Sequence, residues 1–338
     1  MGTYHAKLVI KFFIYPITTI SAKKRPMLIE IINIVLPVFL VIALGWGVRR
    51  IGLVNESFLQ QTNALVYYVC LPLLLFYKIS TADFSLNFNP ALVLGTCLTI
   101  ALCCMTSYGY GHLRHYPAPQ LGAFSQGSFR GNLAYIGLAI VFNAYGDAGL
   151  TRASVLMGFL VPVLNFFAVL ALLWPQHNGS VKGNKQLLPI VVKILANPLI
   201  IASFTGLLWS YLGWPLPVVI ERCLKITTGM SLPLALLALG GGFSLARLRG
   251  DLVMAAMATG IKLLWMPLLA AALLLILGVD GLDLHIGILM SASPAATATY
   301  IMAQQMSADA ELAGSIVVMS TALSIISYSL LLSLFLFL

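Results

Sequence analysis

Residues Ser125–Gly137 read SQGSFRGNLAYIG, a run of polar side chains and glycines that interrupts an otherwise apolar segment of membrane length. A regular helix in lipid satisfies its own backbone groups, whereas glycines and polar side chains in such numbers favour an unwound backbone. Unwound backbone at membrane depth is tolerated only where protein or a water-filled cavity satisfies the freed N–H and C=O groups. We therefore predict an interrupted helix across this run.

The composition places this run in a membrane. The chain has 338 residues, of which 60% are hydrophobic and 9% charged, too little polar surface to cover a soluble globule of that size. The formal net charge is +9, but the cations lie between apolar runs without the basic-aromatic clusters of nucleic-acid binding proteins, so we expect no nucleic-acid partner. The five cysteines lack metal-type spacing, and no nucleophile elbow, phosphate loop or metalloprotease motif is present. We expect no metal site, no cofactor and no catalysis.

Ten apolar stretches each approach the roughly 20 residues that cross a bilayer. They cover residues 29–48, 58–79, 88–109, 120–145, 149–174, 190–211, 217–241, 252–277, 284–306 and 311–337. Matching motifs relate the first five to the last five: Leu71-Pro72-Leu73 aligns with Leu232-Pro233-Leu234, and Asp147-Ala148 aligns with Asp309-Ala310. Because an odd number of spans inverts the second copy, we predict an all-α polytopic membrane protein with a 5+5 inverted repeat.

The repeat gives a simple domain plan. Residues 1–26 form an N-terminal extension, which is interpreted as either an over-extended translation start or an interfacial helix. Residues 27–174 form the first five-helix repeat, 175–188 a short polar linker, and 189–338 the second repeat. Loops on the linker's side carry most of the Lys and Arg, which predicts a cytoplasmic linker, although the basic extension opposes this orientation.

A second polar interruption lies in the ninth stretch. Residues Ser291–Tyr300 read SASPAATATY, and Pro294 removes a backbone donor there. The register of the repeat carries Asn132 onto Pro294, so the two interruptions superpose. If they cross near the midplane, the N-termini of the half-helices present free N–H groups and partial positive charge, which suits an anion. The alternative is that the small residues only permit close helix packing.

Two cations lie deep in their spans. Arg130 and Lys262 are each about ten residues into a span, roughly the bilayer centre at 1.5 Å per residue, and no Asp or Glu lies comparably deep. Intramembrane charges usually face a pathway or a partner, which favours transient pairing with an anionic substrate. Two alternatives stay open: Lys262 as a fixed counter-charge for the carbonyl ends of the broken helices, and Arg130 as a snorkelling or backbone-capping residue.

The predicted substrate site gathers these cations and their polar neighbours, whose neutral side chains supply hydrogen bonds to carboxylate oxygens or to a coupling ion. Its residues are Arg130, Gly131, Asn132, Tyr135, Lys262, Pro294, Thr297, Thr299 and Tyr300. We interpret Asn63 and Asn197 as interhelical hydrogen-bonding residues, the default for a transmembrane amide. Asp147 and Asp309 are interpreted as caps of the helices that begin just after them.

Four stretches resemble the auxin efflux carrier family: Phe129–Leu138, Asn197–Ile201, Leu232–Gly240 and Ser293–Ala296. The resemblance covers nearly the whole chain from Met27. It is greatest to bacterial members, because the large central cytoplasmic loop common in plant members is missing.

This resemblance implies ten helices with a crossover of two broken ones, helices 4 and 9, and an elevator-like unit that moves against a scaffold. It also implies small organic anions such as auxin, malate or malonate as substrates, and it carries the crossover onto Asn132 and Pro294 with their neighbours. Ala139 departs from the family pattern, in which Pro is common, so we expect the first crossover helix to be kinked by glycine.

We therefore expect a secondary transporter, a permease that moves a small carboxylate across the bacterial cytoplasmic membrane by alternating access. Spans 3 to 5 and 8 to 10 would form the moving unit, and spans 1, 2, 6 and 7 the scaffold and the surface of a homodimer. The alternatives are a cation or proton antiporter of related broken-helix fold, which should carry a midplane Asp or Glu, and a membrane scaffold or sensor without transport. The sequence leaves open the acid, the direction of flux and the coupling ion, proton or sodium.

Overall fold

The structure is a computed structural model that describes residues 25–83, 87–177, 196–245, 248–249 and 251–337. Over these residues the chain is helical apart from its connections and one isolated antiparallel bridge. Predictions for residues 1–24 of the N-terminal extension and for residues 178–188 of the linker lie outside the described residues.

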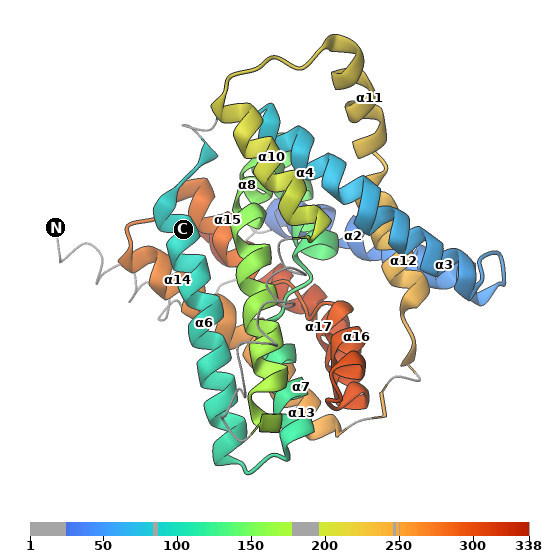
Figure 1. The fold of residues 1–338 in the computed structure, drawn as a ribbon, viewed down its shortest axis with the longest axis vertical. Helices are drawn as coiled ribbons and strands as arrows, with labels where there is room; N and C mark the ends of the chain where they lie inside the picture. The colour runs from blue at the N-terminus through green and yellow to red at the C-terminus, as the bar shows by residue number, and fades with distance from the viewer. Residues whose placement is uncertain (1–24, 84–86, 178–195, 246–247, 250, 338) are drawn as a thin grey trace.

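The helices follow the predicted apolar stretches in order (Figure 1). They are α2 (Arg25–Arg50), α3 (Glu56–Leu65), the π-helical turn η2 (Val66–Cys70), α4 (Leu71–Ser80), α6 (Pro90–Leu113), α7 (Ala118–Phe129), the π-helical turn η3 (Leu133–Gly137), α8 (Leu138–Leu173), the short η4 (Pro175–His177), α10 (Pro198–Tyr211), α11 (Val218–Thr228), α12 (Ser231–Gly242), α13 (Leu252–Gly260), the π-helical turn η6 (Ile261–Trp265), α14 (Met266–Ile276), α15 (Gly281–Ser291), α16 (Ala298–Gln305) and α17 (Ala310–Phe337). α8 contains a sharp bend at Gly146, whose φ of 59° is in the left-handed region.

Seven helical stretches of the described chain are long and apolar enough to cross a membrane. They are Ile29–Arg50, Glu56–Ser80, Pro90–Leu113, Leu133–Leu173, Val218–Gly242, Leu252–Ile276 and Ala310–Phe335. Two shorter apolar helices, α10 and α15, accompany them. The prediction of an all-α protein with several membrane helices is therefore confirmed for the described residues.

Side-chain caps set where several helices begin. Asn89 Oδ1 accepts hydrogen bonds from the first backbone N–H groups of α6, and Asn197 Oδ1 does the same in α10. In both cases a proline follows, and it fits the first turn because its missing donor would have no intrahelical partner there. Asp309 Oδ1 accepts from Leu312 N at the start of α17, which confirms one of the two predicted aspartate caps.

A first group of helices pairs elements from opposite halves of the chain. α2 packs along α12, and α4 packs along α10, as Figure 1 shows. The first pair is close because glycines face backbone: a Cβ on Gly45 would overlap the carbonyl oxygen of Leu237, and a Cβ on Gly240 would overlap that of Ile42. We call α2, α3, η2, α4, α10, α11 and α12 the first unit.

The other membrane helices, α6 to α8 and α13 to α17, form the second unit. Here α6 packs on α7, α8 and α14, while α17 packs on α7 and α13. A carboxylate joins three of these elements: Asp283 of α15 accepts from Arg152 Nη1 of α8 at 2.9 Å and from Asn89 Nδ2 at the start of α6 at 2.8 Å. This network holds the second unit together at one end.

The two units meet where α8 contacts α4 and α10 and where α17 contacts α2. Among the described residues, side-chain hydrogen bonds and an ion pair cross this boundary. Lys78 of α4 forms an ion pair with Asp147 of α8. The structure thus gives Asp147 an ion pair across the boundary, whereas the sequence predicted a helix cap. Asn143 Nδ2 donates to backbone carbonyls of α2, and Tyr135 OH donates to Asn63 Oδ1 at 3.3 Å. The last bond agrees with the interhelical role predicted for Asn63.

Candidate functional site

Two helices of the second unit are interrupted. The first interruption separates the end of α7 at Phe129 from the start of η3 at Leu133. The second separates the end of α15 at Ser291 from the start of α16 at Ala298. Both fall within the runs that the sequence singles out.

The first interruption is shorter than predicted. We expected unwound backbone over the whole run Ser125–Gly137, and this is wrong for its first part, because the chain is helical up to Phe129. The polar groups there bond without unwinding: Ser128 Oγ donates to Phe124 O at 2.8 Å, and Ser125 Oγ lies 3.2 Å from Ser107 Oγ of α6. Residues 130–132 alone leave the helical path before the π-helical turn.

Backbone hydrogen bonds join the two interruptions. Asn132 N donates to Pro294 O at 2.7 Å, and Ala296 N donates to Arg130 O at 3.0 Å, which forms an antiparallel bridge at Gly131. These bonds satisfy backbone groups that a broken helix in lipid would leave free. The two breaks therefore meet in space, at a point we call the crossover.

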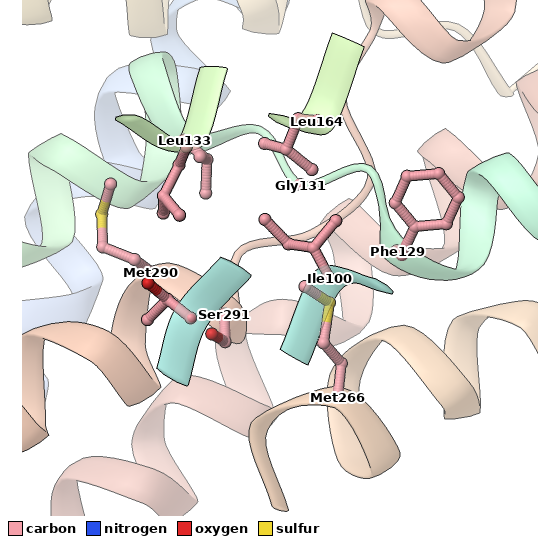
Figure 2. A pocket seen from close by; sticks show the side chains of 10 residues that line it. Ile100, Phe129, Gly131, Leu133, Leu164, Met266, Met290 and Ser291 are labelled. Atoms are coloured by element: carbon pink, nitrogen blue, oxygen red, sulfur yellow. The ribbon is translucent and has the colours of Figure 1, made fainter. Parts of the chain in front are cut away.

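The crossover leaves little room for a side chain at position 131. A Cβ there would overlap Ser293 Oγ and would lie 3.3 Å from Lys262 Nζ. Figure 2 shows Gly131 on the extended segment that runs from Phe129 to Leu133, with no side chain to separate this segment from its neighbours. The close approach, not a left-handed backbone, is what excludes a larger residue.

Helix N-termini lie at the crossover. Asn132 begins η3: its Oδ1 accepts from Tyr135 N at 3.3 Å, and its carbonyl accepts from Gly137 N at 3.0 Å. Thr297 precedes α16 and gives it no side-chain cap. Free N–H groups at a helix start carry partial positive charge and suit anionic ligands.

Lys262 lies on one side of the crossover and is completely buried. Its Nζ donates to Ser291 O, the carbonyl of the last residue of α15, at 2.6 Å, and lies 3.1 Å from Met266 Sδ. The C-terminal carbonyls of a helix carry partial negative charge, which a cation stabilises. This geometry favours the fixed counter-charge interpretation of Lys262.

Arg130 has a different environment. Its Nη2 donates to Asn165 Oδ1 of α8 at 2.9 Å, while its buried Nε and Nη1 atoms have no hydrogen-bond partner in the structure. Tyr67 of η2 lies close enough to Arg130 for an electrostatic interaction. A guanidinium with two unpaired nitrogens can bind a carboxylate with charge-assisted hydrogen bonds.

Further polar groups near the crossover are also unpaired. The buried hydroxyl oxygens of Thr297 and Thr299 and the Oε1 atom of Gln126 have no partner in the structure. Gln126 Nε2 lies 3.5 Å from Met302 Sδ, which places this amide of α7 beside α16. Tyr300 lies on the first turns of α16.

The predicted site residues thus fall into three positions. The crossover itself contains Arg130, Gly131, Asn132 and Pro294, and Tyr135 follows it in η3. Lys262 lies on its α15 side, whereas Thr297, Thr299 and Tyr300 belong to the start of α16.

Sequence reasoning missed Asn165 and Tyr67 as neighbours of Arg130. Each is a single polar residue in an apolar span, a pattern that fits an ordinary interhelical hydrogen bond equally well.

A small cavity lies against the crossover in the second unit (Figure 2). Its lining includes Ile100, Leu133, Leu164, Met266 and Met290, and it is apolar apart from Thr96 and Ser291. The Thr96 hydroxyl already donates to a carbonyl of its own helix, so this cavity offers few free polar groups.

Comparisons with known proteins give consistent similarities. A sequence model of a protein family described as Membrane transport protein (Mem_trans) matches residues 30–332. A protein of Methanothermobacter thermautotrophicus named an uncharacterized transporter is 26% identical over 297 residues, which cover 88% of this chain and 95% of that protein. An uncharacterized transporter of Methanocaldococcus jannaschii is 24% identical over 306 residues, 88% of this chain and 96% of its own. A Rhizobium meliloti protein named "Putative malonate transporter" is 23% identical over 298 residues, 88% and 93% of the two chains.

Proposed function

The chain belongs to the Mem_trans family of membrane transport proteins, the auxin efflux carrier family, and on this premise we propose that it is a secondary carrier for a small organic anion. The carrier works in the cytoplasmic membrane by alternating access. Transporter names among the relatives support transport over catalysis, and the Rhizobium relative's name supports a carboxylate as the transported group.

The observation that carries the proposal is the crossover with an unsatisfied arginine beside it. Two interrupted helices pair through Asn132 N and Pro294 O, while Arg130 keeps two nitrogens without a partner. An unpaired buried cation is costly, so a transient anionic ligand is the simplest occupant. The helix starts at Asn132 and Thr297 add partial positive charge.

We further propose ten spans in a 5+5 inverted repeat. The helix packing supports this arrangement, because the repeat carries spans 1 and 2 onto spans 6 and 7. Under that operation the pair α2 and α12 becomes the pair α10 and α4, and both pairs are observed. The contact of α7 with α17 likewise becomes the contact of α15 with α8.

In this proposal the second unit moves as an elevator against the first, which serves as scaffold and homodimer surface. The network of Asp283, Arg152 and Asn89 supports a second unit that moves as one body. Side-chain bonds across the boundary, such as that of Tyr135 with Asn63, must break and reform as the unit moves.

Reconstituted protein tests the proposal. Proteoliposomes should show saturable uptake of an organic acid that falls sharply in Arg130→Ala and Asn132→Ala. Arg222→Ala is the matched control, since it also removes a cation, but an exposed one in α11 of the first unit. Uptake that is unchanged in both crossover variants, or no saturable uptake of any organic acid, would contradict the proposal.

A further inference from the structure

Lys262 and Arg130 flank the same crossover, but of these two side chains only Arg130 has buried nitrogen atoms without a hydrogen-bond partner in the structure. The Lys262 ammonium is 0% exposed and is engaged by Ser291 O and Met266 Sδ. Its bond to the end of α15 stabilises that helix terminus, so the charge already has a counterpart. Arg130 is partly exposed as a whole residue, but its Nε and Nη1 atoms are buried without a partner, and Asn165 engages the third nitrogen.

The crossover backbone also packs closely on the Lys262 side. A Cβ at Gly131 would overlap Ser293 Oγ and would lie 3.3 Å from Lys262 Nζ, so the backbone at Gly131 lies close to both side chains. The cavity on this side shares Met266 and Ser291 with the lysine and has an apolar lining (Figure 2). A carboxylate placed there would find few hydrogen-bond donors besides an ammonium that already donates to Ser291 O.

The surroundings of Arg130 are polar but neutral. Asn165 holds the guanidinium, Tyr67 lies nearby, and Tyr135 and Asn63 are bonded to each other across the unit boundary. Amides and phenols can orient a carboxylate, but they add no positive charge. The hydrogen bonds of the described residues bring no third lysine or arginine to the crossover.

We infer that the substrate presents a single ionised carboxylate, which Arg130 alone neutralises, and that Lys262 is a positioning residue that fixes the end of α15 at the crossover. This inference rests on the proposed function. A dicarboxylate would bring a second ionised group to a site whose other cation is engaged, and an unpaired buried carboxylate is strongly disfavoured. The carrier therefore discriminates by charge against a dianion of the same carbon skeleton.

This inference is tested by binding measurements on the purified full-length protein in nanodiscs at pH 7.5. Nanodiscs enclose no volume, so leakage of weak acids across a membrane cannot affect the result. Isothermal titration compares two matched pairs, propionate with malonate and lactate with tartronate. We expect each monocarboxylate to bind at least about tenfold more tightly than its dicarboxylate partner, the factor given by about 1.4 kcal/mol. Malonate or tartronate binding more tightly would overturn the monocarboxylate inference and leave an anion carrier in place. No binding by any acid in either class, together with no uptake, would instead contradict the proposed function.

Variants separate the two roles. Arg130→Gln should weaken monocarboxylate binding by at least about tenfold, because hydrogen bonds to a charged group are lost. Lys262→Gln keeps a donor for Ser291 O and should leave Kd within about threefold while it lowers the maximal uptake rate, as expected of a residue that positions a moving segment. Equal losses of affinity in both variants would overturn the positioning role. If Lys262→Gln does not fold, Lys262→Arg supplies the same comparison, and the wild-type selectivity decides the substrate class on its own.

Discussion

Each side of the crossover carries one cation, and the two cations are used in opposite ways. On the α15 side, Lys262 bonds to a helix-terminal carbonyl, and apolar side chains fill the surroundings. On the η3 side, Arg130 is held by a neutral amide and keeps unpaired nitrogens. The difference shows that the partner of a buried charge, more than its depth, distinguishes a structural cation from one that is free for a ligand.

The largest effect on uptake is expected from substitution of Gly131, which lies at the crossover between its two sides. Gly131→Ala places a methyl group against Ser293 Oγ, an overpacking that typically costs about 1–3 kcal/mol and here pushes the paired segments apart. Uptake should fall below about a tenth of wild type even where the protein is still inserted, because the site geometry depends on that pairing. Proteoliposome uptake normalised to inserted protein measures this.

Gly47→Ala is the matched control for that variant. Gly47 lies in α2, and a Cβ there meets nothing within 4 Å. It should transport like wild type, since alanine only favours the helix. Equal uptake in Gly131→Ala and wild type would show that the crossover does not need this close approach.

The next largest effect is expected at Arg130 itself, the cation with unpaired nitrogens. Arg130→Lys keeps the charge but loses the planar fork that binds carboxylate oxygens and Asn165 together. We expect the KM for uptake to rise by roughly tenfold, with the unfolding temperature nearly unchanged. A Lys variant with wild-type KM would mean that charge alone is recognised.

A smaller effect is expected at the amide that orients the arginine. Asn165→Ala removes the acceptor of Arg130 Nη2. We expect KM to rise by about threefold to tenfold, because one hydrogen bond to a charged group is lost and water replaces it only in part. Asn143→Ala is its control, because that amide bonds to backbone carbonyls of α2 and should leave KM unchanged. Similar KM changes in the two variants would indicate a general effect of losing a transmembrane amide.

The smallest effect is expected from a cation that pairs at the boundary between the units. The side chain of Lys78 is 15% exposed and that of its partner Asp147 is 78% exposed, and ion pairs open to solvent contribute about 0–1 kcal/mol. Lys78→Met should therefore change uptake by less than about twofold, and the change should shrink further at high salt. A loss as large as that of Arg130→Lys would assign this boundary pair a role in the transport cycle.

The sequence predicts the position of both interruptions because glycine or proline clusters with polar side chains at these two places in otherwise apolar stretches. It overestimates the unwound length, since Ser125 and Ser128 satisfy their hydroxyls from within a helix. The partner of Lys262 is a backbone carbonyl of a distant helix, and no side-chain pattern records such a bond. Asn165 is likewise inconspicuous until the fold places it beside Arg130.

Accessibility of the two positions tests the central asymmetry most directly. In a variant without the native cysteines, Arg130→Cys and Lys262→Cys are each treated in membranes with an anionic, water-soluble thiol reagent. Cysteine at position 130 should be labelled, while cysteine at position 262 should stay unlabelled. Rapid labelling at position 262, with none at position 130, would contradict the account.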